Sequence, residues 1–249
     1  MRPPRSRSSV FGALAAVLVL VSGCAAEEPQ TGGAEGAPTA ISVPTRTVTP
    51  TQEPTVASFD KAALSIDDPS SIWVVVNRAR ALNPEDYSPG DLVDVPVEHT
   101  WDPMLRQEAS DAAVALFAAA RTEAALVLAS NSAYRSYSTQ VRLFSPDDPT
   151  TAPPGHSEHQ TGLAIDIGAG SGYCSIEECF ADTPEGQWLA ANAWRFGFLL
   201  RYPADKIDVT GYTFEPWHFR YIGVELATEM HTTGVTTLEE FFELPAAPM

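Results

Sequence analysis

The sequence predicts an α+β fold, a single domain in which a small antiparallel sheet is flanked by helices. Segments with helical spacing of apolar residues are mixed with short apolar runs suited to strands. They lack the regular strand–helix alternation of a parallel sheet. The 249 residues suffice for one domain with appendages, and five Trp, seven Tyr and eleven Phe can supply a core. We find no internal repeat.

The first predicted helix runs from Pro103 to about Glu123. Asp102 is expected as its N-cap, with Pro103 in the first helical position. Apolar residues then recur at helical spacing, namely Leu105, Ala109, Ala112, Leu116 and Ala119. The short apolar run 125–129 that follows is suited to a buried strand.

A second helix is expected to begin at Thr183 and Pro184. Its apolar side would carry Trp188, Leu189, Ala193 and Phe196. Gly197 is placed to end the helix, because glycine readily adopts the left-handed conformation of a helix terminus.

The remaining elements are short. Residues 198–201 and 217–221 are expected to form strands. Thr236 with Glu239 forms a capping-box pattern, which predicts a last short helix.

The first 23 residues are expected to be an export signal. Arg2, Arg5 and Arg7 precede the apolar run 11–21, which is too short to span a bilayer comfortably as a mature anchor. Small residues then lead to Cys24, and this pattern resembles the bacterial lipobox, in which the cysteine is acylated. An ordinary signal peptide with an incidental cysteine is the alternative. A diacyl anchor would hold the protein on the outer face of the bacterial cytoplasmic membrane.

Residues 24–58 are expected to be a disordered tether. They are rich in Pro, Thr, Gly, Ala and Glu and contain almost no large apolar residue, so they cannot bury enough surface to fold. As a coil the tether would span roughly 30 Å, and at most about 110 Å when stretched. The folded domain is expected over residues 59–249.

The charge of the chain argues against nucleic acid as a partner. The formal net charge is −17, and the sequence has no basic stripe. Such an acidic protein would be repelled by phosphate backbones.

We expect the protein to be a monomer.

Once Cys24 is assigned to the lipobox, two cysteines remain, Cys174 and Cys179. In an oxidising compartment this pair is expected to form a disulfide that closes a small loop. A metal-binding pair is the alternative, but no second cysteine pair is present to complete a tetrahedral site.

Two separate clusters carry the residues suited to hydrolytic chemistry. His159 and Asp166 are seven residues apart around a glycine, and His218 follows about fifty residues later. Two histidines and one carboxylate form a three-ligand zinc set that leaves a fourth position open for water. Glu215 lies three residues before His218, where a non-ligand carboxylate could accept a proton. By spacing alone, a core or surface histidine and a turn aspartate remain alternatives.

Four motifs together resemble the D-alanyl-D-alanine carboxypeptidases of the VanY type, within the LAS group of zinc peptidases. The motifs occur in order at residues 131–140, 154–162, 197–203 and 211–221. The resemblance covers roughly residues 74–242. It implies an enzyme that removes the C-terminal D-alanine from peptidoglycan stem peptides with the help of Zn²⁺.

The resemblance also assigns roles to individual residues. It implies that His159, Asp166 and His218 are the zinc ligands and that Glu215 is the catalytic base. Arg135 would stabilise the developing oxyanion or hold the substrate, since a guanidinium stays charged and presents a fork of donors. A structural ion pair is the alternative for Arg135.

Four further residues are candidate substrate contacts. Ser157, Tyr134 and Gln140 could bind the terminal carboxylate or the backbone of the substrate, with local capping or turn bonding as the alternative. Trp217 could form a wall of the pocket or belong to the core. His156 is expected at the pocket rim or the surface, because the family pattern has no ligand at that position.

The chain departs from the family pattern between two of the motifs. Relatives have a longer helical segment where this chain has only residues 141–153, among them several prolines and aspartates. The change affects one pocket wall and hence substrate preference. An LD-carboxypeptidase acting on tetrapeptide stems and a crosslink endopeptidase therefore remain alternatives. A wall-binding lipoprotein with a structural metal is a further one, although structural zinc normally has four protein ligands.

Overall fold

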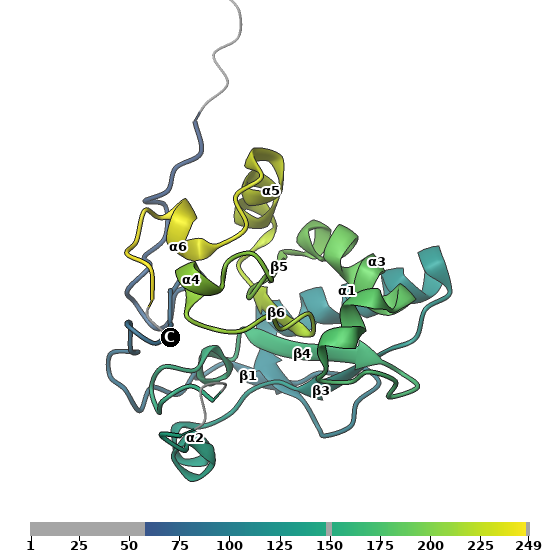
Figure 1. Cartoon of the computed structure of the whole chain (residues 1–249), viewed down its shortest axis with the longest axis horizontal. Helices are drawn as coiled ribbons and strands as arrows, with labels where there is room; N and C mark the ends of the chain where they lie inside the picture. The colour runs from purple at the N-terminus through teal and green to yellow at the C-terminus, as the bar shows by residue number, and fades with distance from the viewer. Residues whose placement is uncertain (1–57, 148–150, 248–249) are drawn as a thin grey trace, which may run out of the picture. The chain divides into compact units, whose positions relative to one another are not determined.

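A four-stranded antiparallel sheet in the order β3-β4-β6-β5 forms the centre of the fold (Figure 1). The computed structural model describes residues 58–147 and 151–247, so the predicted signal, the lipobox at Cys24 and almost all of the predicted tether lie outside the described residues. The strands are β3 (Leu128–Ser132), β4 (Ala164–Ala169), β5 (Phe198–Leu200) and β6 (His218–Tyr221). The antiparallel sheet and its helices confirm the predicted α+β class.

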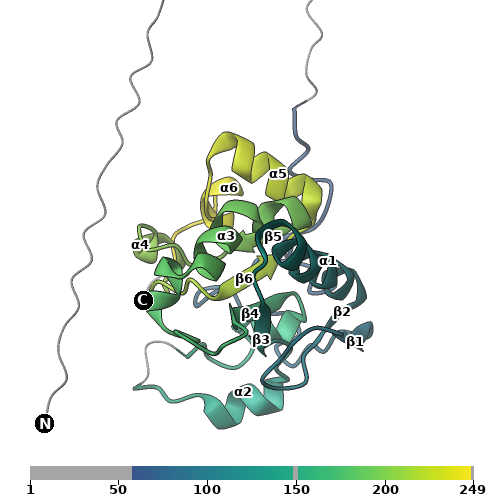
Figure 2. The ribbon, with the colours of Figure 1, turned by 90° about the vertical axis from the view of Figure 1, so that its right-hand side faces the viewer.

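Two helices cover one face of this sheet. Helix α1 (Gln107–Ala124) packs on β3, and α3 (Pro184–Asn192) packs on β4 and on α1. The core between them contains the fully buried side chains of Leu116, Leu189 and Ile167. Helix α2 (Tyr137–Leu143) lies on the other side of the sheet in both views (Figures 1 and 2). In the described part of the chain, no helix has both the length and the apolar character needed to cross a membrane.

The start of the first helix differs from the prediction. Residues Met104–Arg106 form strand β2, which pairs with β1 (Leu92–Asp94), and α1 begins only at Gln107. Asp102 is therefore not the N-cap. The backbone at Arg106 is extended and its N–H bonds to the carbonyl of Gly162 at 2.9 Å, so tertiary pairing overrides the local Asp-Pro signal.

The first strand of the main sheet starts later than predicted. Ala125 ends α1 with a left-handed φ of 56°, and its N–H bonds back to Arg121 at 3.1 Å. Leu126 likewise bonds back to Ala120. These residues complete the helix terminus, which shifts β3 to residues 128–132.

The start of the second predicted helix is confirmed, but the α-helix ends at Asn192, earlier than predicted. The side chain of Thr183 accepts a hydrogen bond from the N–H of Gly186 at 3.0 Å, which caps α3. A short 3-10 turn, η3 (Ala193–Phe196), follows, and Gly197 ends it with φ 81°. The strand expected at 198–201 is β5, and the strand expected at 217–221 is β6.

The last helix, α6 (Leu238–Phe241), is capped by a different residue from the one predicted. Thr237, not Thr236, accepts the hydrogen bond from Glu240 N. The carboxylate of Glu239 is turned into the protein, where it meets the buried Arg201 at 2.7 Å. With Glu239 paired to Arg201, the capping interaction falls one residue later, where the hydroxyl of Thr237 also donates to Oε2 of Glu240 at 2.8 Å. The other short elements are η1 (Glu158–Thr161), η2 (Glu178–Asp182), α4 (Ile207–Thr210) and α5 (Val224–Thr233).

Candidate metal centre

Sheet register brings two of the predicted ligands together. Asp166 on β4 is directly opposite His218 on β6, so their side chains lie on the same face of the sheet. His159 belongs to η1, which precedes β4. Gly162 ends this turn with φ 67°, and a side chain there would collide with Leu92 at 2.8 Å. The glycine thus allows the chain to turn from His159 directly into β4.

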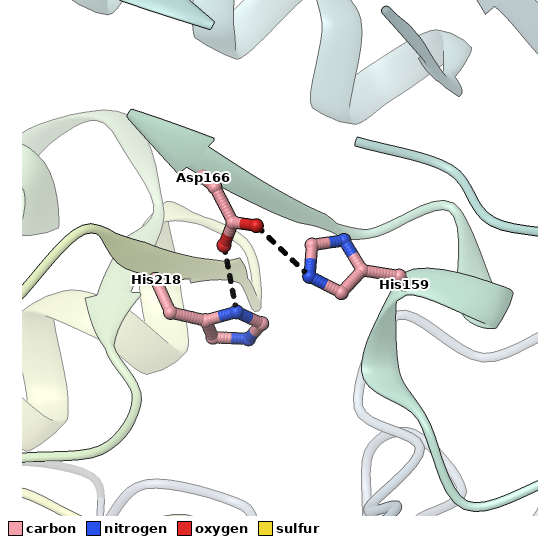
Figure 3. A group of neighbouring side chains, drawn as sticks. All are labelled: His159, Asp166 and His218. Carbon is pink, nitrogen blue, oxygen red and sulfur yellow. Dashed lines mark hydrogen bonds and ion pairs between the residues drawn. The ribbon is translucent and has the colours of Figure 1, made fainter. Parts of the chain in front are cut away.

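The three side chains form one buried cluster, with Asp166 between the two rings (Figure 3). The Nε2 atom of His159 is 3.3 Å from Oδ2 of Asp166, and Nδ1 of His218 is 3.0 Å from Oδ1. One ligand atom from each residue lies within 4.8 Å of the others. Two imidazoles and one carboxylate with this separation fit a zinc ion that has an open fourth position.

Each histidine is fixed by a hydrogen bond on its outer nitrogen. Nδ1 of His159 lies 2.7 Å from the carbonyl oxygen of Ala133, which leaves Nε2 for a metal. Nε2 of His218 lies 3.2 Å from Oε2 of Glu158, which leaves Nδ1. The two rings therefore present different nitrogens to the centre, and an acceptor on the far side sets each tautomer.

Glu158 is part of a fully buried ion cluster. Its Oε1 accepts hydrogen bonds from Arg201 Nε at 2.8 Å and from Arg220 Nη1 at 3.0 Å. Arg201 also forms two bonds to Glu239, at 2.8 and 2.7 Å. Burial by itself would raise the pKa of Glu158, but Arg201 and Arg220 outweigh it and hold that pKa below its usual range.

Sequence reasoning assigned no role to Glu158, Arg201 or Arg220. The signal in the sequence that could have drawn attention to these residues was their charge. Arg201 and Arg220 fall within the predicted strands 198–201 and 217–221, where a fully buried charge must be paired. The pattern could not identify the partners, which lie 43 and 62 residues away along the chain.

Glu215 lies beside the three-residue cluster but outside it. Its Oε2 is 3.9 Å from Nδ1 of His218, and its side chain is 15% exposed. Burial, opposed by His218 and assisted by Asp166, raises the pKa of Glu215 to about 7. A carboxylate with a pKa near neutrality, next to a metal site, is suited to accept and return a proton.

Arg135 faces the same site. Its backbone N–H bonds to the carbonyl of His159 at 3.1 Å, and its guanidinium donates to Gln140 Oε1 at 3.1 Å and to Ser132 Oγ at 3.4 Å. Both side-chain partners are neutral oxygens, so these contacts position the guanidinium without neutralising its charge. Gln140 is in turn held by a bond to the carbonyl of Ala152 at 2.6 Å.

A cavity of about 340 Å³ opens over the cluster. Two predicted substrate contacts, Ser157 and Trp217, line it together with Glu215 and Arg135. The other two are placed differently: Gln140 is buried behind Arg135, and the hydroxyl of Tyr134 pairs with Ser88 at 3.1 Å. Neither side chain is among those that line the cavity.

Two tyrosines that the sequence analysis did not single out also form a wall of the cavity. The ring of Tyr202 stacks on His218 with centroids 4.8 Å apart, and Tyr212 packs against Tyr202 at 4.6 Å. The buried hydroxyl of Tyr212 has no hydrogen-bond partner among the described residues. Thr151 and Ala152, from the segment that is shortened relative to the family pattern, contribute to another wall.

The predicted disulfide between Cys174 and Cys179 is confirmed, with Cα atoms 5.6 Å apart. The loop that it closes carries Ile176, which lines the cavity. His156 lies outside the cluster, as expected: it is partly buried and its Nδ1 contacts the carbonyl of Asn77 at 2.8 Å.

Comparison with known proteins gives concordant results. A family model described as VanY, D-alanyl-D-alanine carboxypeptidase, matches residues 102–224. The YodJ protein of Bacillus subtilis strain 168 is 40% identical over 193 residues, which cover 72% of this chain and 70% of YodJ.

Two solved structures share the fold. The LdcB LD-carboxypeptidase is 39% identical, with a TM-score of 0.65 over 73% of this chain and 89% of LdcB. A variant of the D,D-pentapeptidase VanY from a VanB-type vancomycin-resistance cassette, in complex with Zn(II), is 30% identical. Its TM-score is 0.56 over 69% of this chain and 98% of that chain.

Proposed function

The chain belongs to the VanY family of zinc-dependent carboxypeptidases that act on peptidoglycan peptides, and we propose that it cleaves the terminal D-Ala–D-Ala bond of stem peptides. The buried His159, Asp166 and His218 cluster with Glu215 beside it in one cavity carries the hydrolytic part of the proposal, and the match to the D-alanyl-D-alanine carboxypeptidase family model supports the choice of bond. A VanY relative with the same fold binds Zn(II), which supports zinc as the metal here.

His159, Asp166 and His218 would hold the zinc ion through Nε2, a carboxylate oxygen and Nδ1. When bound, zinc supplies Lewis-acid chemistry that acidifies water and polarises a carbonyl. Glu215 accepts a proton from the attacking water on its carboxylate and delivers it to the nitrogen of the leaving D-alanine. Burial raises the pKa of Glu215 towards neutrality in the metal-free site, which favours a carboxylate that can both take up and release a proton.

Arg135 binds the substrate oxygen that gains negative charge, or the substrate carboxylate. Arg135→Ala should lower kcat/KM about 10²–10³-fold, as the loss of an oxyanion donor typically does. Arg135→Lys keeps the charge without the fork and should recover only part of the loss. Steady-state kinetics would distinguish the two roles, because loss of transition-state stabilisation lowers kcat and loss of substrate binding raises KM. If kcat and KM are unchanged in both Arg135→Ala and Arg135→Lys, Arg135 has neither role.

One comparison favours a second candidate. The LdcB relative, at 39% identity, is an LD-carboxypeptidase. The same catalytic residues could cleave the bond before the last D-alanine of a tetrapeptide stem. The choice depends on how the cavity accommodates the residue before the scissile bond. Ile176, in the disulfide loop, and Thr151, in the shortened segment, both line the cavity. Contacts from these two walls could select the substrate residue that precedes the scissile bond.

The specificity test uses purified stems of both lengths. We expect the zinc-loaded enzyme to shorten pentapeptide stems by one D-alanine and to leave tetrapeptides intact, as measured by mass spectrometry. A Glu215→Gln preparation purified in parallel controls for contaminating peptidases.

Conversion of tetrapeptide to tripeptide, with pentapeptide untouched, would instead establish LD-carboxypeptidase activity. Cleavage of crosslinked dimers alone would identify an endopeptidase. A protein that retains zinc but cleaves no wall peptide would instead support the alternative of a non-catalytic wall-binding protein.

We also propose that the domain works outside the cytoplasm, with a signal peptide at 1–23, a tether at 24–58 and the enzyme at 59–249. The Cys174–Cys179 disulfide supports an oxidising compartment, and the proposed peptidoglycan substrate also lies outside the cytoplasm. The lipobox-like sequence at Cys24 favours a lipid anchor on the membrane.

Cys24→Ala should prevent lipidation and move the protein from the detergent phase to the aqueous phase in Triton X-114 partition. The reason is that the two acyl chains on this residue would supply the membrane affinity. A Cys174→Ala, Cys179→Ala variant keeps Cys24 and should remain in the detergent phase. Partition that does not change in Cys24→Ala would rule out lipid on this residue.

A further inference from the structure

We propose that Glu158 is a positioning residue for the metal centre, which holds His218 in the tautomer that presents Nδ1 to zinc. This inference rests on the proposed zinc site but assigns a residue outside the ligand set. Glu158 is completely buried, and its Oε2 is 3.2 Å from Nε2 of His218, on the side of the ring away from Asp166.

The two ligand histidines are held by acceptors of different strength. His159 has a neutral backbone carbonyl opposite its outer nitrogen, at 2.7 Å. His218 has a carboxylate in the equivalent place. A carboxylate behind a metal-binding imidazole fixes its tautomer and makes the ring a stronger ligand. His218 is therefore the ligand whose outer nitrogen is held by a side chain rather than by the backbone.

The buried arginines fix the orientation of the Glu158 carboxylate, so that one of its oxygens faces them and the other faces the histidine. Arg201 Nε and Arg220 Nη1 both donate to Oε1, at 2.8 and 3.0 Å. Neither bond goes to Oε2, which is left to accept from His218. Turning the carboxylate out of this plane would leave Nε of Arg201 and Nη1 of Arg220 without these acceptors inside the protein, which is unfavourable.

This arrangement makes glutamine a poor replacement even though it has the same shape. The amide oxygen of a glutamine at 158 would have to face the two arginines, because its NH₂ group cannot accept their hydrogen bonds. The NH₂ group would then donate to Nε2 of His218. That contact stabilises the tautomer with its proton on Nδ1, the nitrogen that the metal requires.

The same cluster supplies a matched control in Glu239. Its carboxylate binds Arg201 at 2.7 and 2.8 Å, as Glu158 does, and it is also fully buried. Its other partner is Nδ2 of Asn77, at 2.8 Å, rather than a metal ligand. Glu239→Gln thus removes one negative charge from the same arginine without changing the contact to His218.

The experiment compares the zinc affinity of Glu158→Gln, Glu239→Gln and wild-type protein by competition with a chromophoric chelator at fixed pH. Loss of an outer-shell partner typically weakens metal binding about 10–100-fold, so we expect that loss for Glu158→Gln. Glu239→Gln should stay within about threefold of wild type. Thermal unfolding of the zinc-free proteins checks that both variants are folded and are destabilised to a similar extent.

Wild-type affinity in a folded Glu158→Gln protein would overturn the proposal, as would an equal loss in both variants. Failure of wild-type protein to bind zinc would instead contradict the proposed function. If Glu158→Gln does not fold, nitrogen NMR of zinc-loaded wild-type protein still tests the inference. The His218 proton should be found on Nε2 and exchange slowly with water; zinc on Nε2, or a rapidly exchanging proton there, would overturn it.

Discussion

Replacing Glu215 with glutamine should lower the rate of wall-peptide hydrolysis by at least about 10²-fold while the protein keeps its zinc. General acid–base groups typically contribute about 10²–10⁴-fold. Glutamine has a similar size but cannot accept the proton from water. The carboxylate lies 3.9 Å from His218 and outside the three-residue cluster, so its loss should leave that cluster intact. Rates and zinc content should be measured in the same samples.

Glu225→Gln is a suitable control, because Glu225 is an exposed glutamate on α5, away from the cavity lining. It should behave like wild type. If Glu215→Gln hydrolyses wall peptides within about threefold of wild type and retains zinc, Glu215 is not the base. Loss of zinc in Glu215→Gln would show that this residue is a ligand.

A His159→Ala, His218→Ala double variant should lose both zinc and activity. Two of the three ligands would be gone, and Asp166 alone cannot hold the ion. Elemental analysis of protein purified without added metal should give about one zinc per chain for wild type and almost none for the variant, because one three-ligand site holds one ion. Activity should fall to background, since removing the ion removes the Lewis acid itself.

His156→Ala is the matched control for this experiment. His156 lies three residues before His159 in sequence, but its Nδ1 contacts the carbonyl of Asn77 and it takes no part in the cluster. It should keep its zinc. Full zinc occupancy in the double variant would refute the assigned ligands, and loss of zinc in His156→Ala would indicate a different set.

These two experiments separate positions of the site that sequence spacing alone could not distinguish. His218 and Glu215 are three residues apart, and both are titratable. The structure places His218 opposite Asp166 in the sheet and Glu215 in the turn that precedes β6. Replacing a ligand should remove the zinc, whereas replacing the base should leave the zinc in place. This difference in zinc content is the most direct check on the proposed chemistry.

Features that depend on neighbours along the chain were determined by the sequence itself. Thr183 and Pro184 begin α3, and Gly197 ends the turn that follows it, because caps and left-handed glycines act over a few residues. The ligand set was also identifiable, since its residues stand in motifs with a recognisable order. The family resemblance made that prediction specific, and the register of β4 and β6 accounts for it physically.

Tertiary structure alone decided the features that depend on distant partners. Strand pairing turned Met104–Arg106 from a predicted helix into β2, and the ion pair with Arg201 turned Glu239 inward and moved the last cap to Thr237. The contacts of Glu158 and Gln140 were likewise invisible in the motifs that contain them. A local pattern specifies spacing along the chain, whereas a buried charge is placed by whatever partner the sheet and the loops bring within hydrogen-bond distance.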